Sequence, residues 1–114
     1  MGKLNINRGT TFSITFNYQE DGVATSLVGS TVRFTMKDTE YDTDATDTTA
    51  AVAKNVTTGT SGGEATITID PSDTATLTPG KYYYDIKVEK ADGTIYKCDE
   101  GTVQLDGSPT NRLT

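Results

Sequence analysis

Hydrophobic and polar residues alternate along four segments of this 114-residue chain, which span positions 11–18, 31–37, 65–69 and 82–89. Successive side chains of an extended backbone point to opposite sides, so strict alternation predicts half-buried β-strands. The residues expected to face the core are Phe12, Ile14, Phe16, Tyr18, Val32, Phe34, Met36, Ala65, Ile67, Ile69, Tyr82, Tyr84, Ile86 and Val88. No apolar period of 3.6 residues persists over three turns, which indicates an all-β fold.

Weaker extended runs and turn signals fill the rest of the chain. A short strand at a sheet edge is predicted over 51–56, and further runs are expected over 94–98 and around Val103 and Leu105. Turns are expected at Glu20-Asp21-Gly22 and Asp92-Gly93, because these residues favour hairpin connections. About seven short strands separated by turns predict an immunoglobulin-like antiparallel β-sandwich.

The domain is expected to be a single unit over 1–114, with little regular structure at two places. Segment 38–49 changes to Asp, Thr and Ala without periodicity, so we predict a mobile acidic loop there. Segment 106–114 is polar and contains Gly and Pro, which predicts a frayed tail. The first residues, 3–8, are expected to be a short lead into the first strand.

One short helical turn is predicted after the segment 65–69. Asp70 can cap exposed N–H groups, Pro71 suits the first helical position, and Asp73 favours the positive end of the helix dipole. The turn can last only to about Leu77, because Pro79-Gly80 ends it. We expect Leu77 to be its anchor in the core.

Composition and charge exclude several classes of partner. The formal net charge is −6, with 10 Lys and Arg residues scattered along the chain, so neither nucleic acid nor an anionic membrane is an expected partner. Threonine is abundant and suits a pleated, half-exposed surface. The chain has a single cysteine, Cys98, so no internal disulfide can form, and a reduced thiol fits synthesis inside the cell. The first ten residues contain no apolar segment of the kind found in signal peptides.

Catalysis is not expected from this composition. The chain has no histidine, which removes the usual general base, the usual zinc ligand and the central member of a Ser-His-Asp triad. Cys98 has no histidine to activate it and is predicted to be a semi-buried structural thiol. The glycines at 59, 62 and 63 are not followed by the Lys-Ser/Thr of a phosphate-binding loop. We therefore predict no catalytic residues and no cofactor.

The acidic loop contains the only candidates for a metal site. Its alternate acidic residues are Asp38, Glu40, Asp42, Asp44 and Asp47. Oxygen ligands at such spacing can bind calcium, with Asp42, Asp44 and Asp47 as the candidate ligands. The order of an EF-hand loop fails, because position 46 is Thr and no Gly follows at 47. A solvated loop without an ion is the favoured interpretation.

The tyrosines divide between core and surface. Tyr82 and Tyr84 share the face of Ile86 and are expected in the core, with their hydroxyls reaching the rim. Tyr83 should then be the exposed tyrosine of that strand. Tyr41, in the acidic loop, is a second exposed candidate. Tyr41 and Tyr83 are therefore the predicted contacts for a partner, either a protein or a sugar that stacks on the ring.

Three segments, taken in order, resemble a known pattern. They are Arg8-Gly9-Thr10-Thr11-Phe12, then 27–34, which reads LVGSTVRF, and then 77–86, which reads LTPGKYYYDI and is followed by Asp92-Gly93 and Glu100-Gly101-Thr102-Val103. Together they resemble small immunoglobulin-like proteins of tailed bacteriophages and prophages, including the N-terminal domain of siphophage baseplate upper proteins. The resemblance covers nearly the whole chain. The Pro-Gly-x-Tyr-x-Tyr strand is also similar to immunoglobulin-like repeats of bacterial surface adhesins.

The resemblance implies a virion structural or accessory protein without enzyme activity. Its expected partners are other virion proteins, with self-association as a further option, and its expected location is the virion after synthesis in the bacterial cytoplasm. The alternative is an immunoglobulin-like binding module on a bacterial surface, which would recognise glycan or protein through Tyr41, Tyr83 and the loop tips. An assembly role also has a physical basis, because a small domain with open sheet edges can add strands from a partner.

Overall fold

The computed structural model describes residues 2–38 and 50–107. Strands account for most of this part of the chain, and a single helical turn lies between the seventh and eighth strands. The elements are β1 (Gly2–Asn7), β2 (Phe12–Asn17), β3 (Gln19–Glu20), β4 (Val23–Ala24), β5 (Thr31–Lys37), β6 (Val52–Val56), β7 (Glu64–Ile69), α1 (Pro71–Thr74), β8 (Gly80–Glu89) and β9 (Ile95–Asp106).

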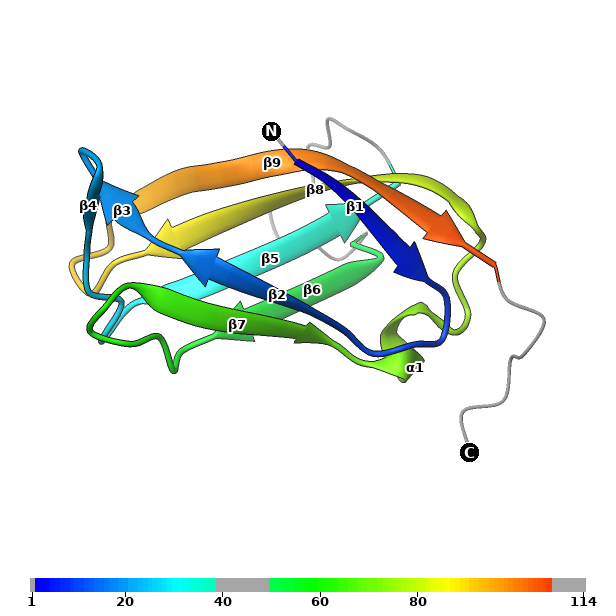
Figure 1. The fold of residues 1–114 in the computed structure, drawn as a ribbon, viewed down its shortest axis with the longest axis horizontal. Helices are drawn as coiled ribbons and strands as arrows, with labels where there is room; N and C mark the ends of the chain where they lie inside the picture. The colour runs from blue at the N-terminus through cyan, green and yellow to red at the C-terminus, as the bar shows by residue number, and fades with distance from the viewer. Residues whose placement is uncertain (1, 39–49, 108–114) are drawn as a thin grey trace.

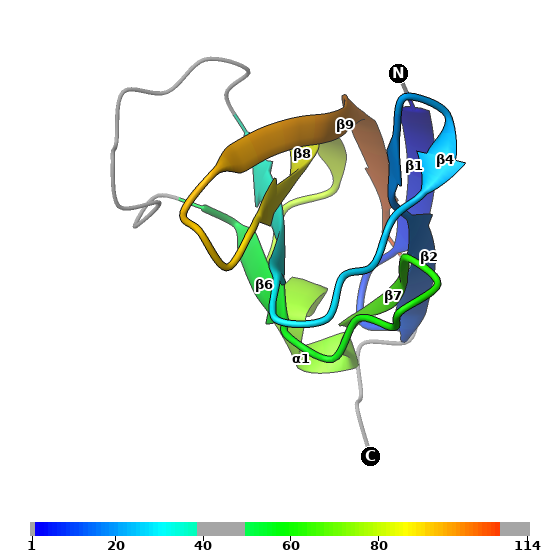
Figure 2. The same cartoon turned by 90° about the vertical axis from the view of Figure 1, so that its left-hand side faces the viewer.

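The strands form two facing sheets and one small hairpin (Figures 1 and 2). The larger sheet has five strands in the order β1-β9-β8-β5-β6, and the smaller sheet pairs β2 with β7. The short strands β3 and β4 pair with each other. All pairs are antiparallel except β1 with β9, which is parallel.

This strand order is that of an immunoglobulin-like sandwich. In that fold, strands C, F and G form one sheet, to which variable-type domains add further strands beside C, and strands B and E lie in the other sheet. Here β5, β8 and β9 occupy the places of C, F and G, β6 lies beside β5, and β2 and β7 occupy the places of B and E. The predicted fold class, an all-β immunoglobulin-like sandwich with about seven strands and one helical turn, is confirmed.

The core lies between the sheets and is filled by the residues that the alternation pattern assigned to it. Along β8 the burial alternates without interruption from Tyr82 to Val88, and β5 and β7 alternate in the same way. On β2, Phe16 is buried, whereas Phe12 and Ile14 pack against the core while half-exposed. The fully buried side chains include Leu27, Val32, Phe34, Met36, Ile67, Ile69, Ile86, Val88, Val103 and Leu105.

Two tyrosines near the start of β8 make contacts that hold the sandwich together, in a chain whose single cysteine allows no internal disulfide. The hydroxyl of Tyr82 donates to the carbonyl oxygen of Thr78 at 2.7 Å. A tyrosine near the start of strand F that bonds back to the backbone a few residues upstream is the tyrosine corner of immunoglobulin-like domains. Two residues later, the Tyr84 ring stacks on Phe34 of β5 with ring centroids 5.7 Å apart.

The helical turn α1 begins where the sequence predicts it. The Asp73 carboxylate accepts a hydrogen bond from the Asp70 backbone N–H at 2.7 Å, and Lys54 lies 2.7 Å from the same carboxylate. The fully buried residue of the turn is Thr74, whose hydroxyl accepts from the Gly9 N–H at 2.8 Å. The expected anchor, Leu77, packs against the core only while half-buried, so Thr74 holds the turn more deeply.

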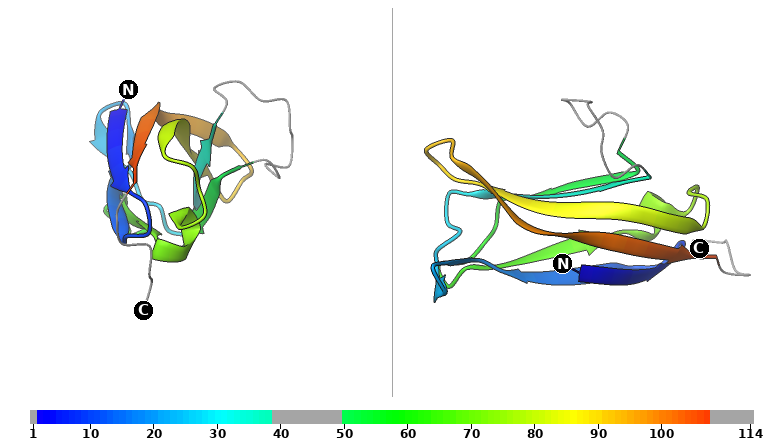
Figure 3. Two further views of the ribbon diagram at one scale, coloured as in Figure 1. Left: turned by 90° about the vertical axis from the view of Figure 1, so that its right-hand side faces the viewer. Right: turned by 90° about the horizontal axis from the view of Figure 1, so that it is seen from above.

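The ends of the chain differ from the sequence-based expectation in three respects. The lead 3–8 contains most of strand β1, which pairs with the second half of β9 (Figure 3). The runs over 94–98 and around Val103 belong to one twelve-residue strand, β9. Asp106, expected in the frayed tail, is the last residue of that strand and pairs with Asn7. Most of the predicted acidic loop, 39–49, and of the tail, 108–114, lies outside the described residues.

Candidate functional site

Within residues 2–38 and 50–107, the exposed large apolar side chains lie in loops and strand ends at one end of the sandwich. This end, called the loop end below, carries the β3–β4 hairpin, the connection into β5 and the turn between β8 and β9, and it lies on the left in Figure 1. Val23, Val28, Ile95 and Tyr96 are exposed there, by 66%, 67%, 59% and 46% respectively. In immunoglobulin variable domains, the B–C and F–G loops of one such end are binding loops.

Two glycines shape the β3–β4 hairpin. Asp21 and Gly22 have positive φ angles of 52° and 80°, as a two-residue turn of type I′ requires. Gly63, with φ of 85°, packs against the backbone of the hairpin. A Cβ atom at this position would lie 2.7 Å from the carbonyl oxygens of Tyr18 and Thr25. The Tyr18 N–H donates to the Gly63 carbonyl oxygen at 2.7 Å. The hairpin is therefore held against the turn that precedes β7.

A polar network joins the β3–β4 hairpin to the β8–β9 turn. The Glu20 carboxylate accepts from the Tyr18 hydroxyl at 2.6 Å and from the Lys90 ammonium at 2.7 Å. Lys90 also lies over the Tyr18 ring, 5.7 Å from its centroid. Each charge thus has a partner, and the two loops are cross-linked at the surface.

Burial and hydrogen bonds in this network shift the pKa values of Tyr18, Glu20 and Lys90. Burial, followed by the hydrogen bond to Glu20, raises the pKa of the Tyr18 phenol far above its usual value. The hydrogen bond from Lys90 and then that from Tyr18 lower the pKa of Glu20. The hydrogen bond to Glu20 raises the pKa of Lys90. All three groups therefore keep their ordinary charge states at neutral pH, which fits a structural tie rather than acid–base chemistry.

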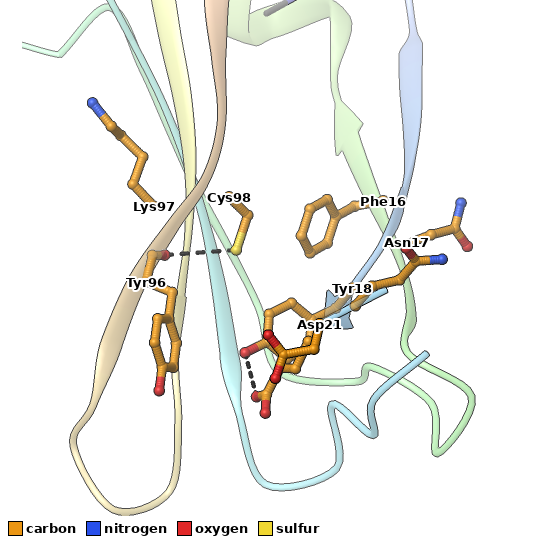
Figure 4. Close-up of a pocket in the computed structure, with 9 residues that line it drawn as sticks. Phe16, Asn17, Tyr18, Asp21, Tyr96, Lys97 and Cys98 are labelled. Atoms are coloured by element: carbon orange, nitrogen blue, oxygen red, sulfur yellow. Dashed lines mark hydrogen bonds between the residues drawn. The ribbon is translucent and has the colours of Figure 1, made fainter. Parts of the chain in front are cut away.

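An open groove of about 560 Å³ lies beside this network (Figure 4). One wall is formed by residues 16–21 and the other by residues 96–98 of β9. Cys98 extends from β9 to the side on which Phe16 lies, whereas Lys97 extends to the opposite side of the strand (Figure 4). The charged side chains on the groove side are therefore the acidic Glu20 and Asp21, with Glu20 already bonded to Lys90.

Cys98 sits at an irregularity in β9. The pairing with β8 passes from Ile86 opposite Asp99 to Lys87 opposite Lys97, so Cys98 is the extra residue of a β-bulge. The prediction of a semi-buried residue is wrong, because Cys98 is exposed at this bulge. Partial burial of the sulfur still raises the pKa of the thiol, which disfavours the reactive thiolate.

Of the two predicted partner contacts, the structure describes only Tyr83, and it does not line the groove. Tyr83 is half-buried on the outer face of β8, where the Lys81 ammonium lies 5.3 Å from its ring centroid. The expectation of an exposed Tyr83 is wrong because β8 is a central strand, and Lys37 and Thr102 flank the ring position on the neighbouring strands. Tyr41 lies outside the described residues.

The calcium candidates Asp42, Asp44 and Asp47, with Glu40, also lie outside the described residues, and Asp38 is an exposed residue just after β5. Within residues 2–38 and 50–107, no group of three or more His, Cys, Asp or Glu residues could hold a metal ion. The same part of the chain contains no helix with the length and apolarity to cross a membrane.

Neither the loop end nor the groove could be identified from the sequence, because the segments that form them are distant along the chain.

Comparison with known proteins finds solved structures that are similar to this one only at low TM-scores and low sequence identity. No known protein family matches the sequence, and no curated protein matches it. One similar solved structure comes from a photo-crosslinking study of multimeric cell-adhesive interactions of VGSC beta subunits. It has a TM-score of 0.44 and 8% identity, covering 96% of this chain and 93% of that chain. Another is murine CRIg, with a TM-score of 0.36, 11% identity, and coverage of 93% and 92%. At such scores the strand order, rather than these likenesses, carries the fold assignment.

Proposed function

We propose that this chain is a non-enzymatic immunoglobulin-like module that works through protein–protein contacts in a phage or prophage virion. It would be a structural or accessory component of the tail, the baseplate or the head. Its partners would be other virion proteins, which it joins after synthesis in the bacterial cytoplasm.

The observation that carries the proposal is the exposed apolar surface of the loop end. Four large apolar side chains, Val23, Val28, Ile95 and Tyr96, are each about half exposed or more at this one end. Exposed apolar side chains are ordinary when scattered, but their gathering at one end of a small domain is typical of an interaction surface. The polar tie between Glu20 and Lys90 stabilises the surrounding loops without supplying a reactive group.

The virion context is supported by the sequence resemblance to immunoglobulin-like proteins of tailed phages. The segments that carry it map to fold-determining parts of the domain. They form the β1–β2 turn, the entry into β5 and the start of β8. The resemblance therefore supports the type of domain, and the loop end supports its use in protein contact.

Particles released from a host that carries the gene test this proposal. After density-gradient purification, quantitative mass spectrometry should find the chain in the particles at a fixed ratio to a major virion protein. Val28→Glu should reduce this ratio, because it places a charge in the apolar surface, whereas Thr66→Glu, an exposed change on β7, should not. Absence of the wild-type chain from particles and from any complex with a virion protein would refute the virion role.

A binding module of a bacterial surface is the second candidate, and one observation favours it. Tyr96 is an exposed aromatic residue beside the groove, and such a ring can stack on a sugar. Binding to a glycan array that is lost in Tyr96→Ala, together with absence from particles, would select this candidate over the virion module.

A further inference from the structure

Half of the outer edge of β9 has no strand beside it in the described structure. On its inner side β9 pairs with β8 along almost its whole length. On its outer side β1 pairs only with residues 101–106, and it begins near the middle of β9 (Figures 1 and 3). Residues 95–100, called the open edge below, therefore present strand backbone on the side that faces the groove.

The opposite wall of the groove is also a sheet edge. Among the described strands, β2 pairs only with β7. In an immunoglobulin-like sandwich, the sheet that contains strands B and E has a strand A beside B. Here the first strand, β1, lies in the other sheet, so the place beside β2 is not filled by it. The groove is thus bounded on one side by the open edge of β9 and on the other by the end of β2 and the start of the β3–β4 hairpin.

We propose that the groove accepts an extended basic segment of a partner protein, which pairs as an added strand with the open edge of β9. This proposal rests on the proposed function in protein contact and specifies how the contact is made. A backbone row of N–H and C=O groups gives affinity in strand addition, and alternate side chains of the segment give specificity. The six residues of the open edge offer a length of about 20 Å, which suits a segment of five to seven residues.

Charge favours a basic segment from another protein over a second copy of this chain. The groove lining includes the exposed Asp21, and Glu20, whose charge is paired with Lys90, while Lys97 extends away from the groove (Figure 4). The chain carries a formal net charge of −6, so two copies repel each other.

A synthetic peptide tests the proposal directly. The probe is a capped heptapeptide of alternating lysine and valine, titrated into the ¹⁵N-labelled full chain at low salt. We expect slower amide hydrogen exchange in residues 95–100 and shifted resonances in residues 16–21. The same peptide with N-methyl groups on alternate amides should not bind, because it cannot complete the strand pairing. A peptide of alternating glutamate and valine should not bind either.

Variants of the protein locate the contact. Asp21→Asn removes a charge and keeps a residue that tolerates the left-handed turn, so it should weaken binding about two- to five-fold. Asp106→Asn makes the same change on the part of β9 that β1 covers and should leave binding unchanged. Reaction of Cys98 with N-phenylmaleimide should reduce binding at least about ten-fold, because the adduct fills the groove. Cys98→Ser treated in the same way should bind like the untreated protein.

Three results would overturn strand addition at this edge. They are equal binding of the N-methylated peptide, protection that appears in β6 instead of residues 95–100, and dimerisation of the free protein through residues 95–100. If any of them occurred while Val28→Glu still reduced incorporation into particles, the proposed function would stand and the strand addition would be wrong. If the peptide bound as expected but the chain were absent from virions and from complexes with virion proteins, the virion role alone would be refuted.

Discussion

Tyr84 and Tyr83 are neighbours on β8 that face opposite sides of the sheet, so truncating each in turn tests the assignment of the core. Tyr84 is 5% exposed, and its ring stacks on Phe34 at 5.7 Å with an interplanar angle of 23°. Truncation of a large buried aromatic residue to alanine costs about 3–5 kcal/mol, and this figure includes the lost ring contact. Tyr84→Ala should therefore remove a large part of the stability of a small domain.

Tyr83→Ala is the matched control. The ring of Tyr83 is half-buried on the outer face, where its main specific contact is with Lys81. The loss of an exposed cation–π contact costs about 0.5–1 kcal/mol, so the free energy of unfolding should fall by no more than about 1 kcal/mol. The difference between the two variants should then be at least about 2 kcal/mol.

Urea unfolding followed by circular dichroism measures both variants. With a slope of about 2 kcal/mol per molar urea, a loss of about 4 kcal/mol lowers the midpoint by about 2 M, and a loss of about 1 kcal/mol lowers it by about 0.5 M. If Tyr84→Ala does not fold, Tyr84→Leu retains apolar volume and should still lose more stability than Tyr83→Leu. A larger loss at Tyr83 than at Tyr84 would show that the facing of β8 is wrong by one residue.

Three further predictions concern the same fold. Tyr82→Phe should cost about 0.5–1.5 kcal/mol in urea unfolding, because it removes the hydrogen bond from the Tyr82 hydroxyl to the Thr78 carbonyl oxygen; an unchanged midpoint would contradict the role of the tyrosine corner. Gly63→Ala should destabilise more than Gly22→Ala, since both have φ near +80° but only Gly63 would bring a Cβ within 2.7 Å of backbone oxygens; equal losses would argue against the close approach. Burial raises the pKa of Tyr84 from 10.0 to about 12, so the folded state holds this proton more tightly than the unfolded chain. Stability should therefore be constant with respect to this group below about pH 10 and fall between about pH 10 and 12, and Tyr84→Phe should show a smaller fall over that range.

The faces of the long strands could be predicted because each carries an uninterrupted two-residue period. Val32, Phe34 and Met36 on β5 and Ala65, Ile67 and Ile69 on β7 are all buried as expected. Such strands have one face on the core and one toward water, so the sequence pattern and the burial pattern coincide. The start of α1 could also be predicted from local sequence, because Asp70 and Asp73 are placed to begin a helical turn and are hydrogen-bonded there.

The continuity of β9 could not be predicted because the bulge shifts the alternation by one residue. Tyr96 pairs with Val88 and shares its face, whereas Val103 pairs with Tyr82 on that same face. One of these positions is even and the other odd, so no single period of two joins them. The pattern alone therefore divides the strand into two runs, and only the pairing with β8 shows that they are one.

The first strand and the groove were missed for a different reason, which is that they depend on contacts between distant segments. In β1 only Leu4 and Ile6 are apolar, too few to distinguish a strand from a polar lead. Its place is decided by parallel pairing with the far end of the chain. The groove likewise joins residues 16–21 to residues 96–98, and neither segment contains a motif that identifies the other.

The polar network at the loop end bears on how the groove could bind a strand. An extended segment loses conformational freedom when it is ordered on a surface, and a mobile surface would add its own loss to that cost. Here Glu20 is part of one wall of the groove, and its contact with Lys90 ties that wall to the turn that leads into the other wall. The Gly63 carbonyl holds the same hairpin from the opposite side through Tyr18. Both walls are therefore positioned before a partner arrives, and the ordering cost falls mainly on the incoming segment.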